Sequence, residues 1–122
     1  MTRTVVVFYA EGNVAPALEQ LDDFAESVQD KLFYRVRRLE EAGHELRRPE
    51  ADILRDGIYE LRVRRQRVNY RLLYFFHRHV AVIAHACTKE GAVNNADIDR
   101  AIARRKFYEK SPEAHSYVPP GN

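Results

Sequence analysis

Two alternating runs, Ile58 to Arg64 and Val68 to His77, constrain the fold of this chain more than any other feature. Each run alternates apolar with polar or charged side chains, and the turn dipeptide Asp56-Gly57 precedes the first. A short polar break, Arg65-Gln66-Arg67, separates the two runs. Alternation with a period of two places successive side chains on opposite faces of a strand. The sequence therefore predicts a β-hairpin between residues 56 and 77.

The number of residues in the turn decides which side chains of the two strands share a face. If that number is even, even-numbered residues of the first strand lie beside odd-numbered residues of the second. The hydrophobic pattern favours this register, because an odd turn without a bulge would mix arginines into the apolar layer. One face is then expected to be exposed and polar, with Glu60, Arg62, Arg64, Asn69 and Arg71, and the core face to carry Tyr59, Leu61, Val63, Tyr70, Leu72 and Tyr74.

Charge is distributed unevenly along the chain. Residues 1–60 carry 8 basic and 13 acidic side chains (net −5), whereas residues 61–122 carry 12 and 5 (net +7). Between Leu61 and Lys89 there are seven Lys or Arg residues and no Asp or Glu. We therefore expect the second half of the chain to bind an anionic partner.

Length and cysteine content limit the class of protein. A chain of 122 residues, 45% of them hydrophobic, has the size of one domain with a modest core. The single cysteine, Cys87, excludes an internal disulfide and a four-cysteine zinc site, which fits a reducing compartment. The chain has no run of about 18 apolar residues, which is the length needed to cross a membrane. The apolar run from Val5 to Ala10 is too short for a signal peptide. We expect a cytoplasmic protein with no membrane partner.

The segment before the hairpin predicts one strand and two helices. Residues 4–9 are β-branched and aromatic, as in a buried strand. Asn13 can cap a short helix with Pro16 in its first turn. Ser27-x-x-Asp30 can start a longer helix that Gly43 ends, and residues 44–55 are expected to form a connecting loop or an irregular edge. The longer helix has an apolar stripe of Val28, Leu32, Val36 and Leu39 and a charged, solvated face of Lys31, Arg35, Arg38 and Glu41.

The segment after the hairpin predicts a third strand of the meander and a last helix. Arg78-His79 is expected to be a tight turn, followed by a strand from Val80 to Cys87. Asn94 or Asn95 can cap a helix with Ile98, Ala101 and Ile102 on its apolar face. Residues 111–122 include three prolines without periodicity and suggest a disordered or loosely docked tail to a domain of residues 1–110.

Several familiar chemistries lack their residues in this chain. It has no phosphate-binding glycine loop, no nucleophile elbow and no His-Glu-x-x-His motif. The histidines His77, His79 and His85 could suggest a metal site. A structural role is favoured, because no cysteine or carboxylate lies at ligand spacing beside them, and an even second turn would place His85 on the face opposite Arg71. We expect no metal and no cofactor.

The arginines of the hairpin form a candidate phosphate-binding site. Guanidinium groups offer fixed pairs of donors that match phosphate oxygens, and a sheet holds them in a defined geometry. Such a surface can bind RNA or cleave it by attack of the ribose 2′-hydroxyl, which requires a proton acceptor, cations for the phosphorane and a donor for the leaving oxygen. The alternative is that Arg62, Arg64 and Arg71 are solvated or pair with Glu60.

Three sequence blocks resemble the RelE/ParE toxin superfamily. They are Leu54-x-Asp56-Gly57-Ile58-Tyr59-Glu60-Leu61-Arg62, Tyr70-Arg71-Leu72-Leu73-Tyr74-Phe75, and His85-Ala86-Cys87-Thr88-Lys89 with the later Ile98-x-x-Ala101. The order of strand, two helices, three-stranded meander and terminal helix agrees with them. Within the superfamily, the chain is most similar to the HigB-like, phage-derived branch of type II toxin–antitoxin systems, over roughly residues 4–108.

The resemblance implies a fold, an activity and partners. The fold would be α+β, a compact domain with a small, mostly antiparallel sheet, two N-terminal helices and a C-terminal helix. The activity would be ribosome-dependent mRNA cleavage that inhibits translation, needing no cofactor. An antitoxin encoded beside the toxin, typically a helix-turn-helix protein, would neutralise it.

The resemblance also assigns roles to residues. Arg62, Arg71 and Lys89 would be catalytic, binding the phosphate or stabilising its transition state, and Glu60 would orient the arginines. The candidate RNA-binding residues are Arg64, Arg65, Arg67, Arg105 and Tyr108, the last as a base-stacking aromatic.

The chain departs from the family pattern at Lys89, where relatives often carry two adjacent lysines and then a proline-containing turn. Two other functions remain open at this point: a ParE-like inhibitor that arrests DNA gyrase by protein contact, and an inactive phage-derived binding module.

Overall fold

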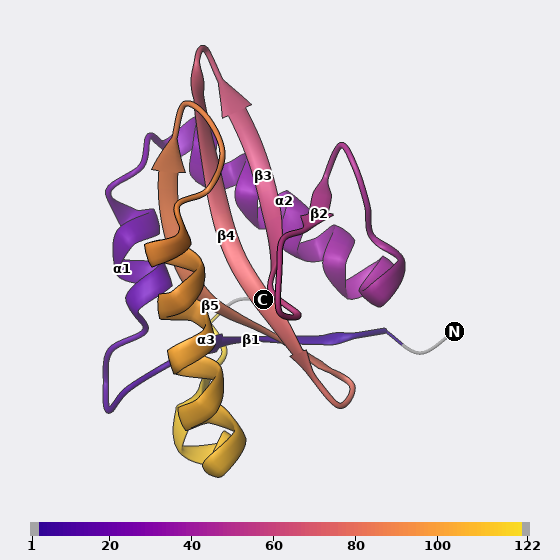
Figure 1. Ribbon diagram of the computed structural model, residues 1–122, viewed down its shortest axis with the longest axis vertical. Helices are drawn as coiled ribbons and strands as arrows, with labels where there is room; N and C mark the ends of the chain where they lie inside the picture. Colours follow the sequence, from indigo (N-terminus) through magenta and orange to yellow (C-terminus); the bar gives the residue numbers. More distant parts are fainter. Residues whose placement is uncertain (1–2, 121–122) are drawn as a thin grey trace.

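The computed structural model describes residues 3–120, which form three α-helices, two short 3-10 helices and six strands (Figure 1). The α-helices are α1 (Pro16–Asp22), α2 (Glu26–Ala42) and α3 (Asn95–Lys110), and the 3-10 helices are η1 (Gly43–Glu45) and η2 (Pro112–His115). The strands are β1 (Val5–Tyr9), β2 (Ala51–Ile53), β3 (Tyr59–Arg65), β4 (Val68–His77), β5 (Val80–Lys89) and β6 (Ser116–Tyr117).

All six strands belong to one sheet with the order β2-β3-β4-β5-β1-β6. Only β1 and β5 are parallel, and every other neighbouring pair is antiparallel. The parallel pair arises because the chain leaves β1, forms α1 and α2, and returns through the β3–β4–β5 meander. This arrangement confirms the expected α+β class with a mostly antiparallel sheet, and it is consistent with a RelE-like fold.

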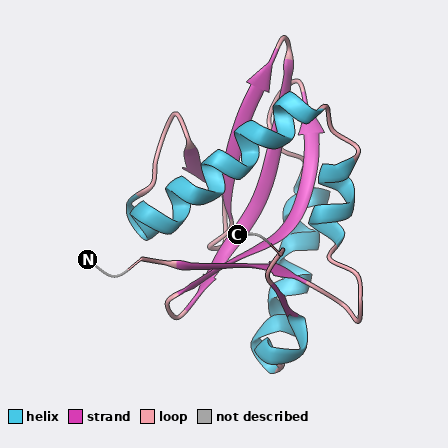
Figure 2. Ribbon diagram, turned by 180° about the vertical axis from the view of Figure 1, so that it is seen from behind, coloured by secondary structure: helices cyan, strands magenta, loops and turns pink. Residues whose placement is uncertain are grey.

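Helices cover both faces of the sheet, which gives the protein two apolar cores. On one face, α1 and α2 pack against the sheet through Leu21, Leu32, Leu61, Leu72 and other buried side chains. Figure 2 shows α2 crossing this face of the strands. On the opposite face, α3 packs through Ile98, Ala101 and Tyr108 against a smaller apolar cluster. Because the sheet is covered on both sides, the central strands are apolar on both faces.

The β3–β4 hairpin has the register that the alternation predicts. Gln66 and Arg67 form a two-residue turn between the paired residues Arg65 and Val68, with Gln66 at a positive φ of 57°. Arg62 lies opposite Arg71 in this register. The expected division into an arginine-bearing face and a core face of tyrosine, leucine and valine is therefore confirmed.

The arginine-bearing face is much less exposed than the sequence suggested. Glu60 and Arg71 are each only 3% exposed, and Asn69 is 6% exposed. The α3 face of the sheet is a second core at its base, where Ile58, Leu73 and Phe75 pack. The prediction of one exposed polar face was wrong. The alternation separates the two faces of the hairpin but does not show that helices cover both faces.

A β-bulge in β5 changes the face on which His85 lies. The turn Arg78-His79 is even as predicted, so Phe75 lies opposite Val82, but the register shifts between Leu73 and Tyr74. Beyond that shift His85 lies opposite Leu73, on the same face as Arg71. The placement of His85 on the face opposite Arg71 was therefore wrong. An extra residue in one strand reverses the parity of every residue after it.

Helix boundaries follow the apolar stripes better than the expected caps. The stripe of α2 is buried as predicted, and Gly43 at φ 57° ends the helix by donating its N–H to Leu39. However, Ala15 and Ala25 occupy the N-cap positions of α1 and α2, where Asn13 and Ser27-x-x-Asp30 were expected. Asn94 is the N-cap residue of α3, although its side chain makes no capping hydrogen bond.

The C-terminal segment differs from the disordered or loosely docked tail that its composition suggested. Pro112–His115 form η2, and Ser116–Tyr117 pair as β6 with β1. His115 stacks on Tyr9 with ring centroids 5.1 Å apart, and its backbone carbonyl accepts the N–H of Ala10. Residues 121–122 of the expected tail, like residues 1–2 at the other end, lie outside the described residues. None of the helices within residues 3–120 is sufficiently long and apolar to cross a membrane.

Candidate functional site

The bulge in β5 aligns polar side chains in three rows across β3, β4 and β5. The rows, from the base of the hairpin towards its tip, are Glu60–Leu73–His85, Arg62–Arg71–Cys87 and Arg64–Asn69–Lys89. All nine residues face the side of the sheet on which α3 packs. Lys89 therefore joins the arginines, although the strand that carries it has no alternation to predict this.

A buried carboxylate holds two arginines of this face. Arg71 donates from Nε to Oε1 of Glu60 at 2.8 Å, and both side chains are at most 4% exposed. Arg62 places Nη1 3.7 Å from the other oxygen of Glu60 and keeps 32% of its side chain exposed. Glu60 therefore fixes one arginine in the interior and a second at the surface.

Arg71 has a free donor in spite of its burial. Its Nη2 donates to the carbonyl of Gly91 at 2.9 Å, which joins β4 to the loop before α3. Its Nη1 is buried and has no hydrogen-bond partner within residues 3–120. An unpaired buried donor costs free energy, so this nitrogen is an unsatisfied donor in the row that also holds Arg62.

The loop between β5 and α3 encloses the side of the site that β5 forms. Asn69 donates to the carbonyl of Glu90 at 3.3 Å, and Lys89 donates from Nζ to the Asn94 side chain at 2.9 Å. Lys89 is exposed, so its ammonium can contact a ligand without rearrangement of the core. The N-terminus of α3, which starts at Asn95, lies next to this cation and adds the partial positive charge of a helix dipole.

The exposed part of the site is a cationic groove at the edge of β3. A cavity of about 390 Å³ is lined by Arg35, Pro49, Arg62, Arg64 and Asn69. It lies beyond the end of β2, which pairs with residues 59–61 of β3. Arg62 still donates its N–H to the carbonyl of Glu50 at 3.1 Å, so the outer part of the strand begins after it. We call the residues Arg35, Arg62 and Arg64 the arginine groove.

Two residues near this groove were not identified from the sequence. Arg35 donates from Nε to the carbonyl of Arg62 at 3.2 Å, so the face of α2 that was expected to be merely solvated is tied to β3. Tyr34 is 52% exposed and lines an adjoining cavity of about 420 Å³ that shares Arg35 and Arg64 with the arginine groove. An aromatic residue on the charged side of an amphipathic helix was the available signal for Tyr34.

The remaining sequence-predicted RNA contacts are dispersed. Arg65 donates to the Ser27 hydroxyl at 3.2 Å, and Arg67 is exposed in the hairpin turn. Arg105 donates to the backbone carbonyl of Asp56 at 2.6 Å, at the base of the hairpin and away from the groove. Tyr108 is 3% exposed and packs its ring against Phe75 and His77, so its assignment as a base-stacking residue was wrong.

A second polar cluster forms where His85 and Cys87, the β5 members of two rows, meet α3. His85 Nε2 lies 2.7 Å from Oδ1 of Asp97, and Arg104 contacts His85 Nδ1 at 3.3 Å while donating to the carbonyl of Ala84 at 2.6 Å. Burial lowers the pKa of His85, although Asp97 acts in the opposite direction. Burial also raises the pKa of the Cys87 thiol to about 12. Both groups are therefore neutral at neutral pH.

The side chains of His85, Cys87 and Asp97 lie close enough together to bind one metal ion. The expectation that no cysteine or carboxylate would lie at ligand spacing beside the histidines was wrong. His85 and Cys87 are two residues apart on one strand, which was visible in the sequence. Asp97 joins them only because α3 packs over β5.

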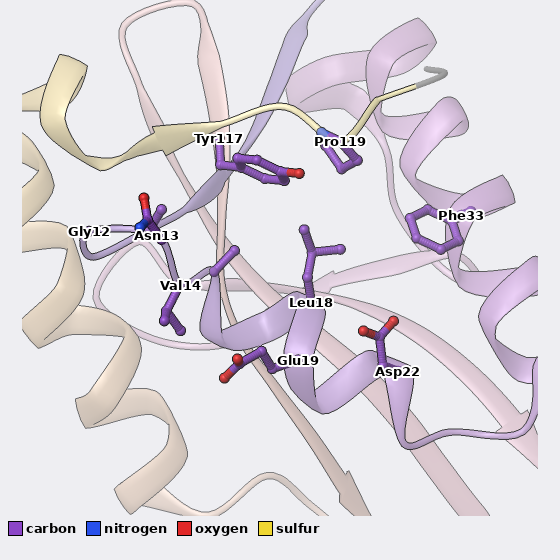
Figure 3. Close-up of a pocket in the computed structure, with 11 residues that line it drawn as sticks. Gly12, Asn13, Val14, Leu18, Glu19, Asp22, Phe33, Tyr117 and Pro119 are labelled. Atoms are coloured by element: carbon purple, nitrogen blue, oxygen red, sulfur yellow. The ribbon is translucent and has the colours of Figure 1, made fainter.

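A larger groove, which shares no lining residue with the arginine groove, lies between α1, α2 and the C-terminal segment (Figure 3). It has a volume of about 470 Å³, and its lining includes Val14, Leu18, Phe33 and Tyr117. Figure 3 shows Glu19 and Asp22 on its α1 side, and no arginine or lysine lines it. Size alone would favour this groove, but an acidic rim repels a phosphate, so the arginine groove is the better candidate for an anionic ligand.

The chain matches the model of a known protein family. The family model described as "Phage derived protein Gp49-like (DUF891)" matches residues 19–106, well over half of the chain. The match spans the three rows of side chains on β3, β4 and β5 and ends within α3. No curated protein sequence matches the chain.

Proposed function

The chain belongs to the Gp49-like family of phage-derived proteins, and from this membership we propose that it is a toxin of a type II toxin–antitoxin system. Its activity would be ribosome-dependent endonucleolytic cleavage of mRNA, which inhibits translation. The family is associated with RelE-like toxins, and the proposal places this chain in the HigB-like branch. The antitoxin, a helix-turn-helix protein, would bind the toxin and block its activity.

The observation that carries the proposal is the pairing of Arg62 with Arg71 across the hairpin, with Glu60 between them. This pairing links a buried guanidinium with an unused donor to the exposed arginine groove. A phosphodiester in the groove would receive charge-assisted hydrogen bonds from Arg62 and Arg64. Such bonds hold a phosphate in a fixed orientation, which is the first requirement for its cleavage.

Each residue of the site has a distinct role in this proposal. Arg62 binds a non-bridging phosphate oxygen and stabilises the charge that grows on the phosphorane. The free Nη1 of Arg71 donates to the same group once the phosphate approaches the row. Lys89 adds a third cation at the end of β5, and Glu60 positions the two arginines without contacting RNA.

Tyr34 and Arg35 extend the proposed RNA surface onto α2. An exposed aromatic ring beside a cationic groove is the arrangement with which proteins bind single-stranded nucleic acid: the groove follows the backbone and the ring stacks on a base. Because stacking and phosphate contacts are tolerant of sequence, this surface would bind mRNA in a largely sequence-independent manner.

The test is to express the protein in bacteria and map mRNA 5′ ends together with growth. The wild type is expected to arrest growth and produce new ends within coding regions. The variant Arg62→Ala/Arg64→Ala removes two exposed cations and leaves the buried Glu60–Arg71 pair intact, so it should fold and lose cleavage. Arg78→Asn removes a charge from the exposed β4–β5 turn and should cleave as the wild type does.

Three outcomes would contradict the proposal. Growth arrest with intact messages would exclude cleavage as the cause, and supercoiling assays would then test gyrase inhibition. Unchanged cleavage by the folded Arg62→Ala/Arg64→Ala variant would remove the arginine groove from the mechanism. Absence of any effect on growth would indicate an inactive binding module.

A further inference from the structure

Three metal-binding side chains of different chemical type converge between β5 and α3. His85 and Cys87 lie on β5, and Asp97 lies in the first turn of α3. One ligand atom from each, the imidazole nitrogen, the sulfur and a carboxylate oxygen, lies within 4.8 Å of the other two. All three side chains are partly buried.

The fold produces this convergence by two independent features. The β-bulge in β5, where the register shifts opposite Leu73 and Tyr74, turns His85 and Cys87 to the α3 face of the sheet. One residue separates His85 from Cys87. The N-cap at Asn94 then starts α3 so that Asp97 lies over them. Without the bulge, His85 and Cys87 would face the opposite core, and Asp97 would have no partner from β5.

We propose that His85, Cys87 and Asp97 bind a single Zn²⁺ ion. Imidazole nitrogen, thiolate sulfur and carboxylate oxygen are the three protein ligands that zinc uses, and three of them leave the fourth tetrahedral position to a water or a substrate atom. The thiolate and the carboxylate together balance the two charges of the ion. The occupied site is therefore neutral, which limits the cost of placing it in a partly buried position.

Binding requires a small rearrangement. Ligand distances of about 2.0–2.3 Å place tetrahedral ligand atoms roughly 3.3–3.8 Å apart. Separations that now reach at most 4.8 Å must therefore shorten, and the 2.7 Å between His85 Nε2 and Asp97 Oδ1 must lengthen. The hydrogen bond between His85 Nε2 and Asp97 is replaced by two bonds to the ion. The Cys87 thiol releases its proton to solvent as it binds, because the thiolate is the metal ligand. The imidazole proton moves to Nδ1, which opens the 3.3 Å contact with Arg104 but leaves the 2.6 Å bond from Arg104 to Ala84 in place.

The zinc site goes beyond the proposed function and does not depend on it. Cys87 lies opposite Arg71 in the strand register, so the ion would lie beside Arg71. However, none of the three ligands is a residue to which the RNA proposal assigns a contact. Metal binding can therefore succeed or fail whether or not the protein cleaves RNA.

Cobalt provides a direct test, because Co²⁺ takes the place of Zn²⁺ and absorbs light. Tag-free, full-length protein would be treated with a chelator, dialysed and titrated with Co²⁺. We expect tetrahedral d–d bands, a thiolate-to-cobalt charge-transfer band that reports Cys87, and saturation at one ion per chain. Adding Zn²⁺ should abolish both signals by competition.

Matched variants separate this site from adventitious binding. Cys87→Ser is nearly isosteric and should abolish the charge-transfer band, and Asp97→Asn should weaken Co²⁺ binding roughly tenfold or more. His79→Gln, which changes an exposed histidine in the β4–β5 turn, should bind as the wild type does. Circular dichroism of each metal-free variant confirms that it is folded.

The proposal would be overturned by a titration without a charge-transfer band, or by a band that persists in folded Cys87→Ser protein. Equal loss of binding in His79→Gln and Asp97→Asn would also overturn it, because the ion would then be bound by surface groups. As a second readout, saturating Zn²⁺ should raise the melting temperature of the wild type and not that of Cys87→Ser.

Discussion

Arg71 donates from Nε to Glu60 Oε1 at 2.8 Å, in an ion pair whose two side chains are at most 4% exposed. The pair lies between the apolar base of the hairpin and the arginine groove. It holds Arg62 through the second oxygen of Glu60 and the loop before α3 through Gly91. The pair therefore couples the stability of the sheet to the geometry of the candidate site.

Breaking this pair should destabilise the protein more than removing it entirely. Glu60→Leu leaves a buried guanidinium without its carboxylate, so we expect the free energy of unfolding to fall by about 3–5 kcal/mol. The double variant Glu60→Leu/Arg71→Met replaces both charges with apolar groups and should recover most of that loss. Urea denaturation followed by circular dichroism measures both values. A double variant less stable than Glu60→Leu alone would contradict this interpretation.

Removal of the exposed arginines should weaken RNA binding and reduce its dependence on salt. A plot of log K against log salt concentration has a negative slope, and each lost phosphate contact with a single strand reduces the magnitude of that slope by about 0.7. Arg62→Ala/Arg64→Ala should therefore reduce the slope by about 1.4, and the measurement is fluorescence anisotropy with a labelled oligoribonucleotide at several salt concentrations. Arg78→Asn, which removes one exposed arginine outside the groove, is the control. A slope equal to that of the wild type in the double variant would show that these arginines do not contact phosphates.

Tyr34→Ala should lower the affinity for single-stranded RNA by about 1–3 kcal/mol, the usual contribution of one stacked base. The matched control is Phe107→Ala, because Phe107 on α3 is 54% exposed against 52% for Tyr34 and lies outside the groove. Tyr34→Phe should retain the affinity, since stacking needs the ring and not the hydroxyl. Equal losses for Tyr34→Ala and Phe107→Ala would indicate a general hydrophobic effect instead of stacking.

Cys87 should react slowly with thiol reagents in the native protein. Burial raises its pKa to about 12 from an ordinary value near 9, so the thiolate fraction at pH 8 falls by about three orders of magnitude. The rate of reaction with a chromogenic disulfide should rise sharply when the protein is unfolded in urea. For the folded protein, the rate should increase with pH throughout the range from 8 to 10. Rapid labelling of the folded, metal-free protein at pH 8 would contradict this prediction.

The sequence determined the hairpin because its alternation is unambiguous. Polar side chains at every second position of β3, together with a turn of an even number of residues, left one register that keeps arginine out of the core formed by Leu61 and Leu72. The apolar stripe of α2 and its end at Gly43 followed from helical periodicity in the same way. The family resemblance was also readable, because the blocks around Glu60 and Arg71 are contiguous in the chain.

Tertiary structure decided the exposure and composition of the site. β5 is apolar on both faces, so its sequence carries no alternation from which the bulge, or the faces of His85, Cys87 and Lys89, could be inferred. Burial of Glu60 and Arg71 depends on how the loop before α3 and the helix itself cover the sheet, which is a long-range contact. The positions of Tyr108 in the core and of β6 beside β1 depend on packing in the same way. Local patterns specify strands and their faces, whereas the contacts that place these faces against each other arise only in the folded chain.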